Sequence, residues 1–488
     1  MKYIFLLISL FTFNFLQAQV TGVVKDAAGE PIPGANVFWM NTTNGVTTNE
    51  DGNFSIHKPA RSHMLVVSFI GFENDTIHVD KGNQQLDIVL REGVELSEVN
   101  VVTRKLGTMK LRTSVMNEDM ISSAELTRAA CCNLGESFVT NPSVDVSYSD
   151  AATGAKQIKL LGLSGTYVQM MTENIPNFRG AAAPYGLGYV PGPWMQSIQV
   201  SKGSSSVKNG YESITGQINV EFKKPQLPEA DWVSANLFAS STNRYEANAD
   251  ATVKLSKRWS TSLLAHYENE TKSHDSNDDG FVDIPRVEQY NVWNRWAYMG
   301  DHYVFQAGIK ALHETRNSGQ IAHGNTPSHD LYEIGIKTNR YEAFTKNAYI
   351  FDKEKNTNLA LILQGTLHNQ DANYGRKLYD VDQSNFYASL LFETELSKQH
   401  SLSAGLSFNY DGYDQNYRLT NQAEEGLTKK FVKESVPGAY VQYTFNLNDQ
   451  LMLMGGIRGD YSSEYGFFVT PRAHVKYHPN EYLHFRLS

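Results

Sequence analysis

The ten residues SLSAGLSFNY (401–410) decide the fold, because apolar and polar side chains alternate along them without a break. One face of an extended strand carries the apolar residues Leu402, Ala404, Leu406, Phe408 and Tyr410. The opposite face carries the small or polar residues Ser401, Ser403, Gly405, Ser407 and Asn409. Such a strand suits a sheet with lipid on one side and water or protein on the other. The same alternation returns in residues 385–396, 438–447 and 451–460, which predicts a membrane barrel rather than a soluble enzyme.

This pattern predicts a train of antiparallel strands through residues 229–488, joined by alternating short and longer connections. Thirteen strands are expected to begin near Trp232, Tyr245, Trp259, Tyr290, Tyr303, Tyr341, Leu359, Phe386, Leu402, Ala439, Leu451, Phe468 and Leu483. Aromatic residues near strand ends fit girdles at the two lipid–water interfaces, namely Trp232, Trp259, Trp293, Trp296, Tyr443 and Tyr477. Thirteen is odd, whereas single-chain bacterial barrels have an even number of strands. We therefore expect an incomplete barrel.

Composition narrows the function classes. The 488 residues are 41% apolar and 19% charged, with a net charge of −9 that argues against nucleic-acid binding. A mean hydropathy of −0.40 does not exclude a membrane protein, because a barrel hides its apolar residues by alternation. Residues 1–18 form a secretory signal by pattern: Lys2, an apolar core, and a cleavage site ending at Ala18. A membrane anchor is the alternative for this segment.

Residues 19–92 read as a small all-β domain. Short apolar strands alternate with Gly/Pro turns, and TTNEDGNFSIHK (47–58) predicts a hairpin over Asp51-Gly52. The stretch GVVKDAAGEPIPGANV (22–37), with VSFIGFE (67–73) after it, resembles the carboxypeptidase regulatory-like β-sandwich. A generic sandwich without that kinship is the alternative.

Residues 105–228 read as mixed α/β, with a helix from about Ser122 to Phe138 and strands on either side of Gly162–Gly165. The stretch from Ile198 to Pro225 resembles the closing motif of the plug of TonB-dependent outer-membrane receptors. Its motif positions are held by Lys202, Gly203, Gly210, Gly216, Asn219 and Pro225. One departure is Glu173-Asn174, where the family often has Asp-Gly; Asn174 is expected to take the left-handed conformation that Gly usually supplies.

Residues 93–104 are a β-prone segment that could add to the edge of a partner's sheet. They resemble the TonB box, and the resemblance implies coupling to TonB through Glu98, Val99, Val101, Val102 and Thr103. An ordinary linker strand is the alternative.

The resemblance covers nearly the whole chain and implies a mainly β fold: an N-terminal β-sandwich, an α/β plug and an antiparallel transmembrane barrel. The family's barrel has 22 strands, so about nine are expected to be missing here. The implied location is the cell outer membrane, with plug and N-terminal domain on the periplasmic side. The implied partners are TonB, outer-membrane lipid and a small nutrient ligand. Plug loops that point outward contact the ligand in this family, which indicates Asn177, Phe178, Arg179, Tyr185 and Tyr189 here.

Among these, Arg179 is the fixed positive charge expected to meet an anionic chelate. We expect uptake of a scarce nutrient, with a ferric siderophore or other metal chelate as first choice. Copper or another soft metal is the second choice, because Cys131-Cys132 and Met170-Met171 supply sulfur. A glycan importer and a surface binding protein that transports nothing are the remaining alternatives.

No catalytic motif is evident, so we expect no enzyme and no required cofactor. The loop HDSNDDGFVDIP (274–285) is the best metal candidate. Asp275, Asn277, Asp279 and Asp283 reproduce the alternating oxygen ligands of a calcium loop, although Arg286 stands where an EF-hand has its bidentate Glu. A structural calcium ion is the hypothesis, and a solvated Asp/Asn turn is the alternative.

Overall fold

The chain is described from a computed structural model that covers two compact units, Met1–Thr103 and Arg104–Ser488. Described are residues 19–488 without 27–28, 41–44, 60–62, 70–71, 73–74, 80–84, 91–107, 111–113, 130–131, 140, 164, 226–231, 322–330, 421–425, 448–449 and 481–482. The expected signal segment and the TonB-box-like segment lie outside the described residues. Within the described part, no helix is long and apolar enough to cross a membrane.

The first unit contains two small sheets with the strand orders β4-β1-β7 and β3-β2-β5-β6. Its strands are β1 Gln19–Lys25, β2 Asn36–Trp39, β3 Gly45–Thr47, β4 Asn53–His57, β5 Met64–Ser68, β6 Asp75–His78 and β7 Gln85–Val89. Alternating residues of both sheets, including Trp39 and Ile56, meet in one buried cluster. This arrangement confirms the sandwich.

The hairpin expected over Asp51-Gly52 is wrong in one respect. The turn forms, since Asn49 Oδ1 accepts the Asn53 N–H at 2.8 Å. The two flanking strands then part, because β3 pairs with β2 whereas β4 pairs with β1. The strands part because burial alternates along β4. Pairing with β1 places the side chains of Phe54 and Ile56 in the core of the sandwich.

The second unit begins with a six-stranded mixed sheet of order β13-β12-β15-β14-β9-β8, which we call the plug together with its loops. Its strands are β8 Thr108–Lys110, β9 Asn117–Ser122, β12 Val168–Thr172, β13 Ile175–Pro176, β14 Met195–Lys202 and β15 Gly216–Phe222. A separate hairpin is formed by β10 Val144–Asp150 and β11 Ala155–Leu160. The helical turns are α2 Ser123–Arg128, η1 Leu134–Phe138, η2 Gly165–Tyr167, η3 Gly180–Ala182, η4 Gly186–Tyr189, η5 Gly192–Trp194 and η6 Val207–Asn209.

The expected helix from Ser122 to Phe138 is wrong, because α2 stops at Arg128 and only a short 3-10 turn, η1, follows. Ser122 does cap the N-terminus of α2, accepting from the Glu125 N–H. The chain then leaves the helix because its backbone finds partners elsewhere: Leu134 N donates to Val190 O, and Gly192 N donates to Cys132 O. These bonds satisfy groups that a continuous helix would otherwise pair internally.

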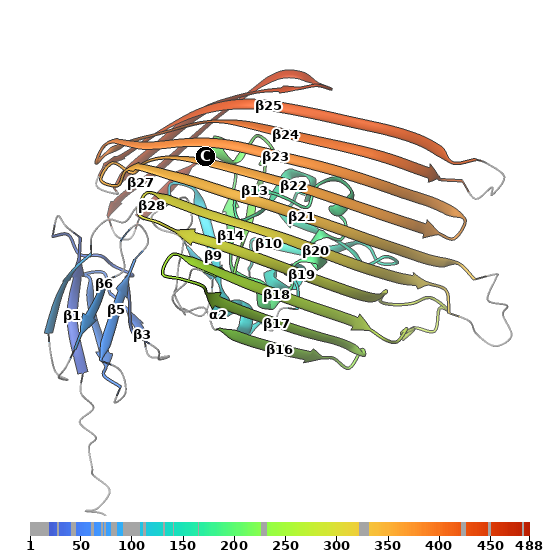
Figure 1. Cartoon of the computed structure of the whole chain (residues 1–488), viewed down its shortest axis with the longest axis horizontal. Coiled ribbons are helices and arrows are strands. Elements are labelled where there is room, and N and C mark those ends of the chain that lie inside the picture. The colour runs from blue at the N-terminus through green and yellow to red at the C-terminus, as the bar shows by residue number, and fades with distance from the viewer. Residues whose placement is uncertain are drawn as a thin grey trace, which may run out of the picture. The chain divides into compact units, whose positions relative to one another are not determined.

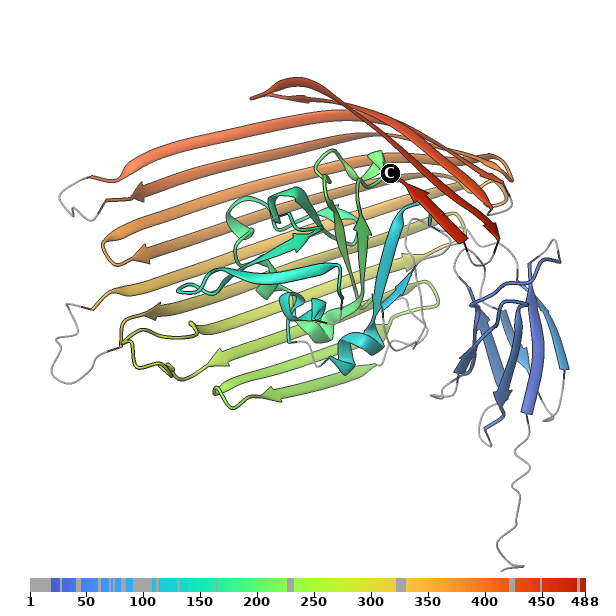
Figure 2. The ribbon, with the colours of Figure 1, turned by 180° about the vertical axis from the view of Figure 1, so that it is seen from behind.

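The remaining residues form one 13-stranded sheet in sequence order, with every neighbouring pair antiparallel; we call it the wall. Its strands are β16 Val233–Ala239, β17 Arg244–Lys254, β18 Trp259–Glu270, β19 Arg286–Met299, β20 Tyr303–Gly319, β21 Glu333–Asp352, β22 Thr357–Tyr374, β23 Lys377–Ser397, β24 His400–Arg418, β25 Thr428–Leu447, β26 Leu451–Ser462, β27 Gly466–Asn480 and β28 Leu483–Leu487. Figure 1 shows the strands side by side, and Figure 2 shows the plug against one face of the wall.

The strand count is confirmed, but β21, β23 and β25 begin eight to eleven residues earlier than expected. In these added segments most side chains that face away from the plug are polar, such as the exposed Asp382 and Lys433, although Phe431 is apolar and 64% exposed. An unbroken apolar alternation therefore starts only partway along each strand. Hydropathy marks the lipid-facing part of a strand, whereas backbone hydrogen bonding continues beyond it.

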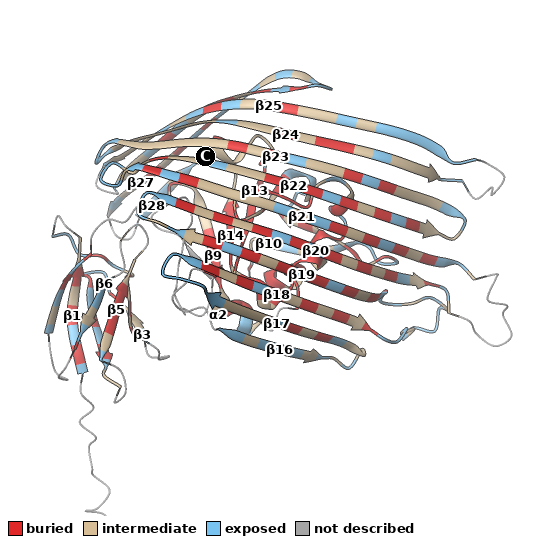
Figure 3. Ribbon diagram, in the orientation of Figure 1, coloured by how far each residue is buried: buried red, intermediate tan, exposed pale blue. Residues whose placement is uncertain are grey.

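Burial alternates along the wall strands as the sequence indicates (Figure 3). In the deciding stretch, Leu406 is 58% exposed on the outer face, whereas Asn409 is buried on the plug side. Ser407 accepts from the Arg458 guanidinium on that inner face. The girdle assignment of Trp293 is wrong: its ring packs against Phe222 of the plug with centroids 4.5 Å apart.

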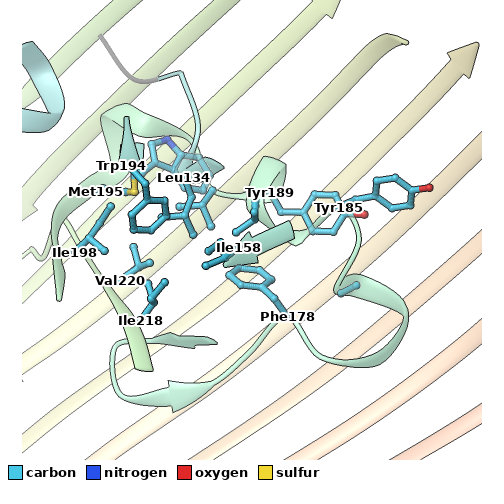
Figure 4. Packing of buried hydrophobic residues seen from close by; sticks show 14 of the residues in the cluster. Leu134, Ile158, Phe178, Tyr185, Tyr189, Trp194, Met195, Ile198, Ile218 and Val220 are labelled. Carbon is cyan, nitrogen blue, oxygen red and sulfur yellow. The ribbon is translucent and has the colours of Figure 1, made fainter. Parts of the chain in front are cut away.

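The plug core continues into the wall without a polar boundary. The buried cluster joins plug residues such as Trp194, Ile218 and Val220 (Figure 4) to inward-facing wall residues on β18 to β22. The wall residues in this cluster are Leu264, Trp293, Leu312, Ile334, Ile336 and Ala372. Apolar burial therefore fixes the plug on one half of the described wall.

Gly216 of the plug motif occupies a position without room for a side chain. A Cβ there would overlap the Ser201 carbonyl oxygen and the Leu160 side chain. We predict that Gly216→Ala lowers the free energy of plug unfolding by about 1–3 kcal/mol, measured by denaturant titration of the detergent-solubilised protein. The control is Gly188→Ala, where nothing lies within 4 Å of the added methyl. Equal stability of the two variants would contradict this account.

Candidate functional site

The turn between β12 and β13 carries a buried ionic contact between the plug and the wall. Glu173 and Asn174 both have positive φ, at 51° and 62°, which confirms the left-handed conformation expected at Asn174. Asn219 Oδ1 accepts the Asn174 N–H at 2.8 Å and holds this turn. Glu173 Oε1 lies 2.6 Å from the Arg295 guanidinium of β19, and both side chains are almost fully buried.

Two further wall groups complete this contact. Lys346 of β21 donates to the Glu173 carbonyl oxygen at 2.9 Å and lies 3.6 Å from its carboxylate. Arg295 also donates to Lys223 O of the plug at 2.6 Å. Buried charges are tolerated only when paired and hydrogen-bonded, so the two cations and Glu173 form one interdependent unit.

The plug-motif residues make contacts within the plug. Lys202 pairs with Asp119 at 2.6 Å, which ties β14 to β9, and Gly203 has a positive φ of 84° where the chain leaves β14. Asn219 donates to Glu221, which in turn pairs with Lys224 at 2.8 Å, and Pro225 is buried. These residues therefore shape and close the plug sheet.

The motif's central loop, residues 203–215, is bound by polar contacts to the other half of the wall. Arg472 of β27 donates to four of its carbonyl oxygens, those of Ser205, Ser206, Tyr211 and Ser213. Lys208 of the loop pairs with Glu393 of β23 at 3.0 Å. Gly210, with a φ of 102°, allows the chain to reverse between these contacts. The plug thus meets β18 to β22 through an apolar core together with buried ionic contacts, and β23 to β27 mainly through polar residues.

The five residues expected to contact a ligand are all largely removed from solvent. Phe178, Tyr185 and Tyr189 belong to the buried core cluster. Asn177 donates to Glu342 Oε2 at 2.8 Å and accepts from the Arg340 guanidinium at 2.6 Å, both on the wall. These four side chains form plug–wall contacts in this structure, so their role toward a ligand stays a prediction.

Arg179 lies at the same apex but is not a free positive charge. Its guanidinium is 2.8 Å from Glu212 of the plug and 3.3 Å from Asp411 of β24. Burial disfavours the charged form, but these two carboxylates outweigh it and hold the pKa of Arg179 above its ordinary value. Arg179 is therefore charged and already neutralised.

Side-chain carboxylates of the loop Asp275–Asp283 accept hydrogen bonds from backbone N–H groups of the same loop. Asp275 accepts N–H groups of Asp279 and Gly280, Asp279 accepts that of Phe281, and Asp283 accepts that of Ser276. Asn277 Nδ2 donates to Asp279 at 3.0 Å. Among the described residues, no three His, Cys, Asp or Glu side chains are arranged to hold a metal ion. Structural calcium at this loop stays a prediction.

The sulfur residues considered for a soft metal are only partly described. Cys131 lies outside the described residues, and Cys132 is buried. Burial first and the nearby Glu246 second raise the pKa of the Cys132 thiol, which disfavours the thiolate that a soft metal requires. Met170 and Met171 are neighbours on β12 and so point to opposite faces.

Sequence reasoning missed the wall residues whose side chains bind the plug: Arg295, Lys310, Arg340, Glu342, Lys346, Arg458 and Arg472. A signal for them was present. Each is a charged residue on the inner face of a strand whose outer face is apolar, because successive side chains point to opposite faces. A buried charge at such a position predicts a partner on whatever fills the inner side.

Removing the charge of Glu173 tests the ionic contact. We predict that Glu173→Gln lowers the free energy of plug unfolding by about 3–5 kcal/mol, because Arg295 and Lys346 lose their buried counter-ion. Denaturant titration and protease cleavage of residues 105–228 would measure this. The matched control is Asp301→Asn in the exposed Arg258–Asp301 pair, where we expect a loss below about 1 kcal/mol. Equal effects of the two substitutions would refute the special role of Glu173.

The comparisons with known proteins agree with this architecture. The family model described as TonB dependent receptor-like, beta-barrel matches residues 201–488. The TonB-dependent receptor plug domain model matches residues 110–217, and the CarboxypepD_reg-like domain model matches residues 20–102.

The relatives are larger proteins. TonB-dependent receptor SusC of Bacteroides thetaiotaomicron is 28% identical over 245 residues, which cover 47% of this chain and 24% of SusC. The alcaligin outer membrane receptor FauA of Bordetella pertussis shares the fold with a TM-score of 0.61 and 14% identity, over 79% of this chain and 66% of FauA. The copper transporter OprC has a TM-score of 0.60 and 12% identity, over 77% of this chain and 62% of OprC. This chain thus spans about a quarter of the length of SusC. The extent of the barrel match, with the plug and sandwich matches before it, shows that the chain belongs to the TonB-dependent receptors.

Proposed function

We propose that this chain serves energised import of a scarce nutrient across the outer membrane and catalyses no reaction of its own. The observation that supports import most directly is the plug bound across the inner face of a two-faced sheet. Arg295, Arg340 and Arg472 of the wall all donate to plug groups. A surface binding protein would not need a separate folded unit held in this place.

The proposed energy source is TonB in the inner-membrane complex, pulling on the segment around Val99–Thr103. This segment precedes β8, the edge strand of the plug sheet, so tension on it would reach the plug directly. The short connections of the wall, such as residues 300–302, would face the periplasm, and the longer ones would face outward. The plug and the N-terminal sandwich would then lie on the periplasmic side.

For the substrate we propose a metal chelate first. The fold neighbours include a receptor for the siderophore alcaligin and a copper transporter. We now place glycan import second, ahead of soft-metal uptake, because the similarity to SusC covers almost half of this chain. Soft-metal uptake through sulfur ligands has less support, since Cys132 is a buried thiol with a raised pKa.

A proline in the coupling segment separates transport from binding. We predict that Val101→Pro abolishes energised uptake, because proline lacks the backbone N–H that pairing with a partner strand requires. Ligand binding to whole cells should stay unchanged, because residue 101 precedes the described strands of the plug and the wall in the sequence. Uptake of a radiolabelled ferric chelate by cells, with binding measured in parallel on ice, gives both quantities.

The control for this experiment is Val101→Thr, which keeps the N–H and a β-branched side chain. It should retain uptake near the level of the unaltered protein. Undiminished uptake in Val101→Pro would refute the coupling assignment. Uptake that persists without the inner-membrane energiser would refute energised import itself.

A further inference from the structure

We propose that the N-terminal sandwich binds a soft monovalent metal ion of the copper(I) class on the outer face of β2, β5 and β6. The ligands are two thioether sulfurs, from Met40 and Met64, and one imidazole nitrogen, from His78. We call these three residues the Met-His row. The row belongs entirely to the first unit, so the proposal stands apart from the import proposed for the plug and the wall.

The three residues of the row are direct neighbours across the sheet. Met64 of β5 and His78 of β6 are cross-strand partners. On the other side of β5, the N–H of Met40, directly after β2, donates to the Met64 carbonyl oxygen at 2.9 Å. Opposite residues of neighbouring strands have Cβ atoms about 4.5–5.5 Å apart. An ion above Met64 is therefore within reach of the long side chains on both sides of it.

The row lies on the face of the sheet that points away from the core. Trp39, Leu65 and Val79, each the sequence neighbour of one row residue, are fully buried in the core cluster of the sandwich. Because successive side chains of a strand point to opposite faces, the three row side chains point outward together. Met40 is 38% exposed and His78 is also exposed, so an ion in solution can reach the row.

The chemistry of these ligands selects a soft ion. Thioether sulfur is polarizable and uncharged and prefers Cu(I), and imidazole also suits copper. Calcium and magnesium ions require oxygen ligands, whereas the next row of residues on this face is Phe38, Val66 and Thr76, none of them a carboxylate. Val66 is only 7% exposed, so the surface beside the Met-His row is apolar. A neutral ligand set beside an apolar surface favours an ion of low charge.

A second histidine orients the imidazole at the end of the row. The rings of His63 and His78 are stacked, with centroids 5.9 Å apart and an angle of 15° between their planes. Lys58 Nζ lies 3.1 Å from His63 Nδ1, and because an ammonium group can only donate, this nitrogen is the acceptor. The neutral ring then carries its proton on Nε2 and has no lone pair left for a metal ion. His63 is therefore a positioning residue rather than a fourth ligand.

Methyl NMR with silver(I) tests the site directly, because each methionine methyl group reports on its own surroundings. Ag(I) has the charge and the ligand preference of Cu(I) and is stable in air. The probe is silver nitrate, titrated in chloride-free buffer into the full chain in detergent, with the methionine methyl groups carbon-13 labelled. We expect the signals of Met40 and Met64, identified through Met40→Leu and Met64→Leu, to shift together and to saturate with a single ion. Calcium ions should leave both signals in place.

Removing one ligand at a time measures what each contributes. Met64→Leu conserves side-chain volume but removes the central sulfur, so the affinity for Ag(I), measured at the Met40 signal, should fall at least about tenfold. His78→Gln should lower the affinity at both methionine signals, and it keeps the test valid if Met64→Leu disturbs the sheet. The matched control is Met299→Leu on the wall, which removes an exposed methionine far from the row in sequence and should leave the titration of Met40 and Met64 unchanged.

Three results would overturn the proposal. The first is a titration in which silver shifts other methionine signals but not those of Met40 and Met64. The second is an equal affinity for Ag(I) in the unaltered chain, Met64→Leu and His78→Gln. The third is a shift of the same size with calcium ions. All three are read on the sandwich itself, so they are independent of the outcome of the uptake assay.

Discussion

The buried contact between Glu173 and the wall is the constraint on which the resting structure depends. A carboxylate removed from water is costly unless cations and hydrogen-bond donors surround it, and here Arg295 and Lys346 supply both. The carboxylate belongs to a turn whose two central residues have positive φ, a conformation held by Asn219. The motif that closes the plug and the charges that bind it to the wall therefore stabilise the same turn.

The plug is bound by two different kinds of contact. On β18 to β22 its apolar core runs into Trp293, Leu312 and Ile336, and separating these surfaces exposes apolar area to water. On β23 to β27 its contacts are mainly ion pairs and hydrogen bonds, such as Lys208 with Glu393, which water can replace at lower cost; the Tyr211 ring against Phe468 is an apolar contact on this side. The asymmetry means that hydration loosens one side of the plug more readily than the other.

Much of this fold could be predicted from the sequence, because period-two alternation is imposed by strand geometry itself. The 13 strands, the sandwich and the plug-closing strands were all within reach of that pattern. The end of the helix after Ser122 could not be predicted. It depends on two backbone hydrogen bonds between residues far apart in the sequence, Leu134 N to Val190 O and Gly192 N to Cys132 O. The true starts of β21, β23 and β25 were hidden because hydropathy follows lipid contact rather than hydrogen bonding.

The candidate site was predictable in outline only. The apex segment was found by its resemblance to the plug, but sequence alone gave Arg179 a free charge that Glu212 and Asp411 in fact neutralise. Asp411 is more than 200 residues away, and nothing local reveals such a partner. The wall charges Arg295 and Arg472 were missed for the same reason, although their place on the polar face of each strand pointed inward.

The central structural claim is that plug and wall form one unit at rest, and hydrogen exchange of the full chain in detergent tests it most directly. The account predicts that amides of β14 and β15 exchange as slowly as those of β19 to β21, because the same buried contacts protect both. Rapid exchange throughout β14 and β15, at the rate of exposed turns such as residues 463–465 and independent of the wall, would contradict it.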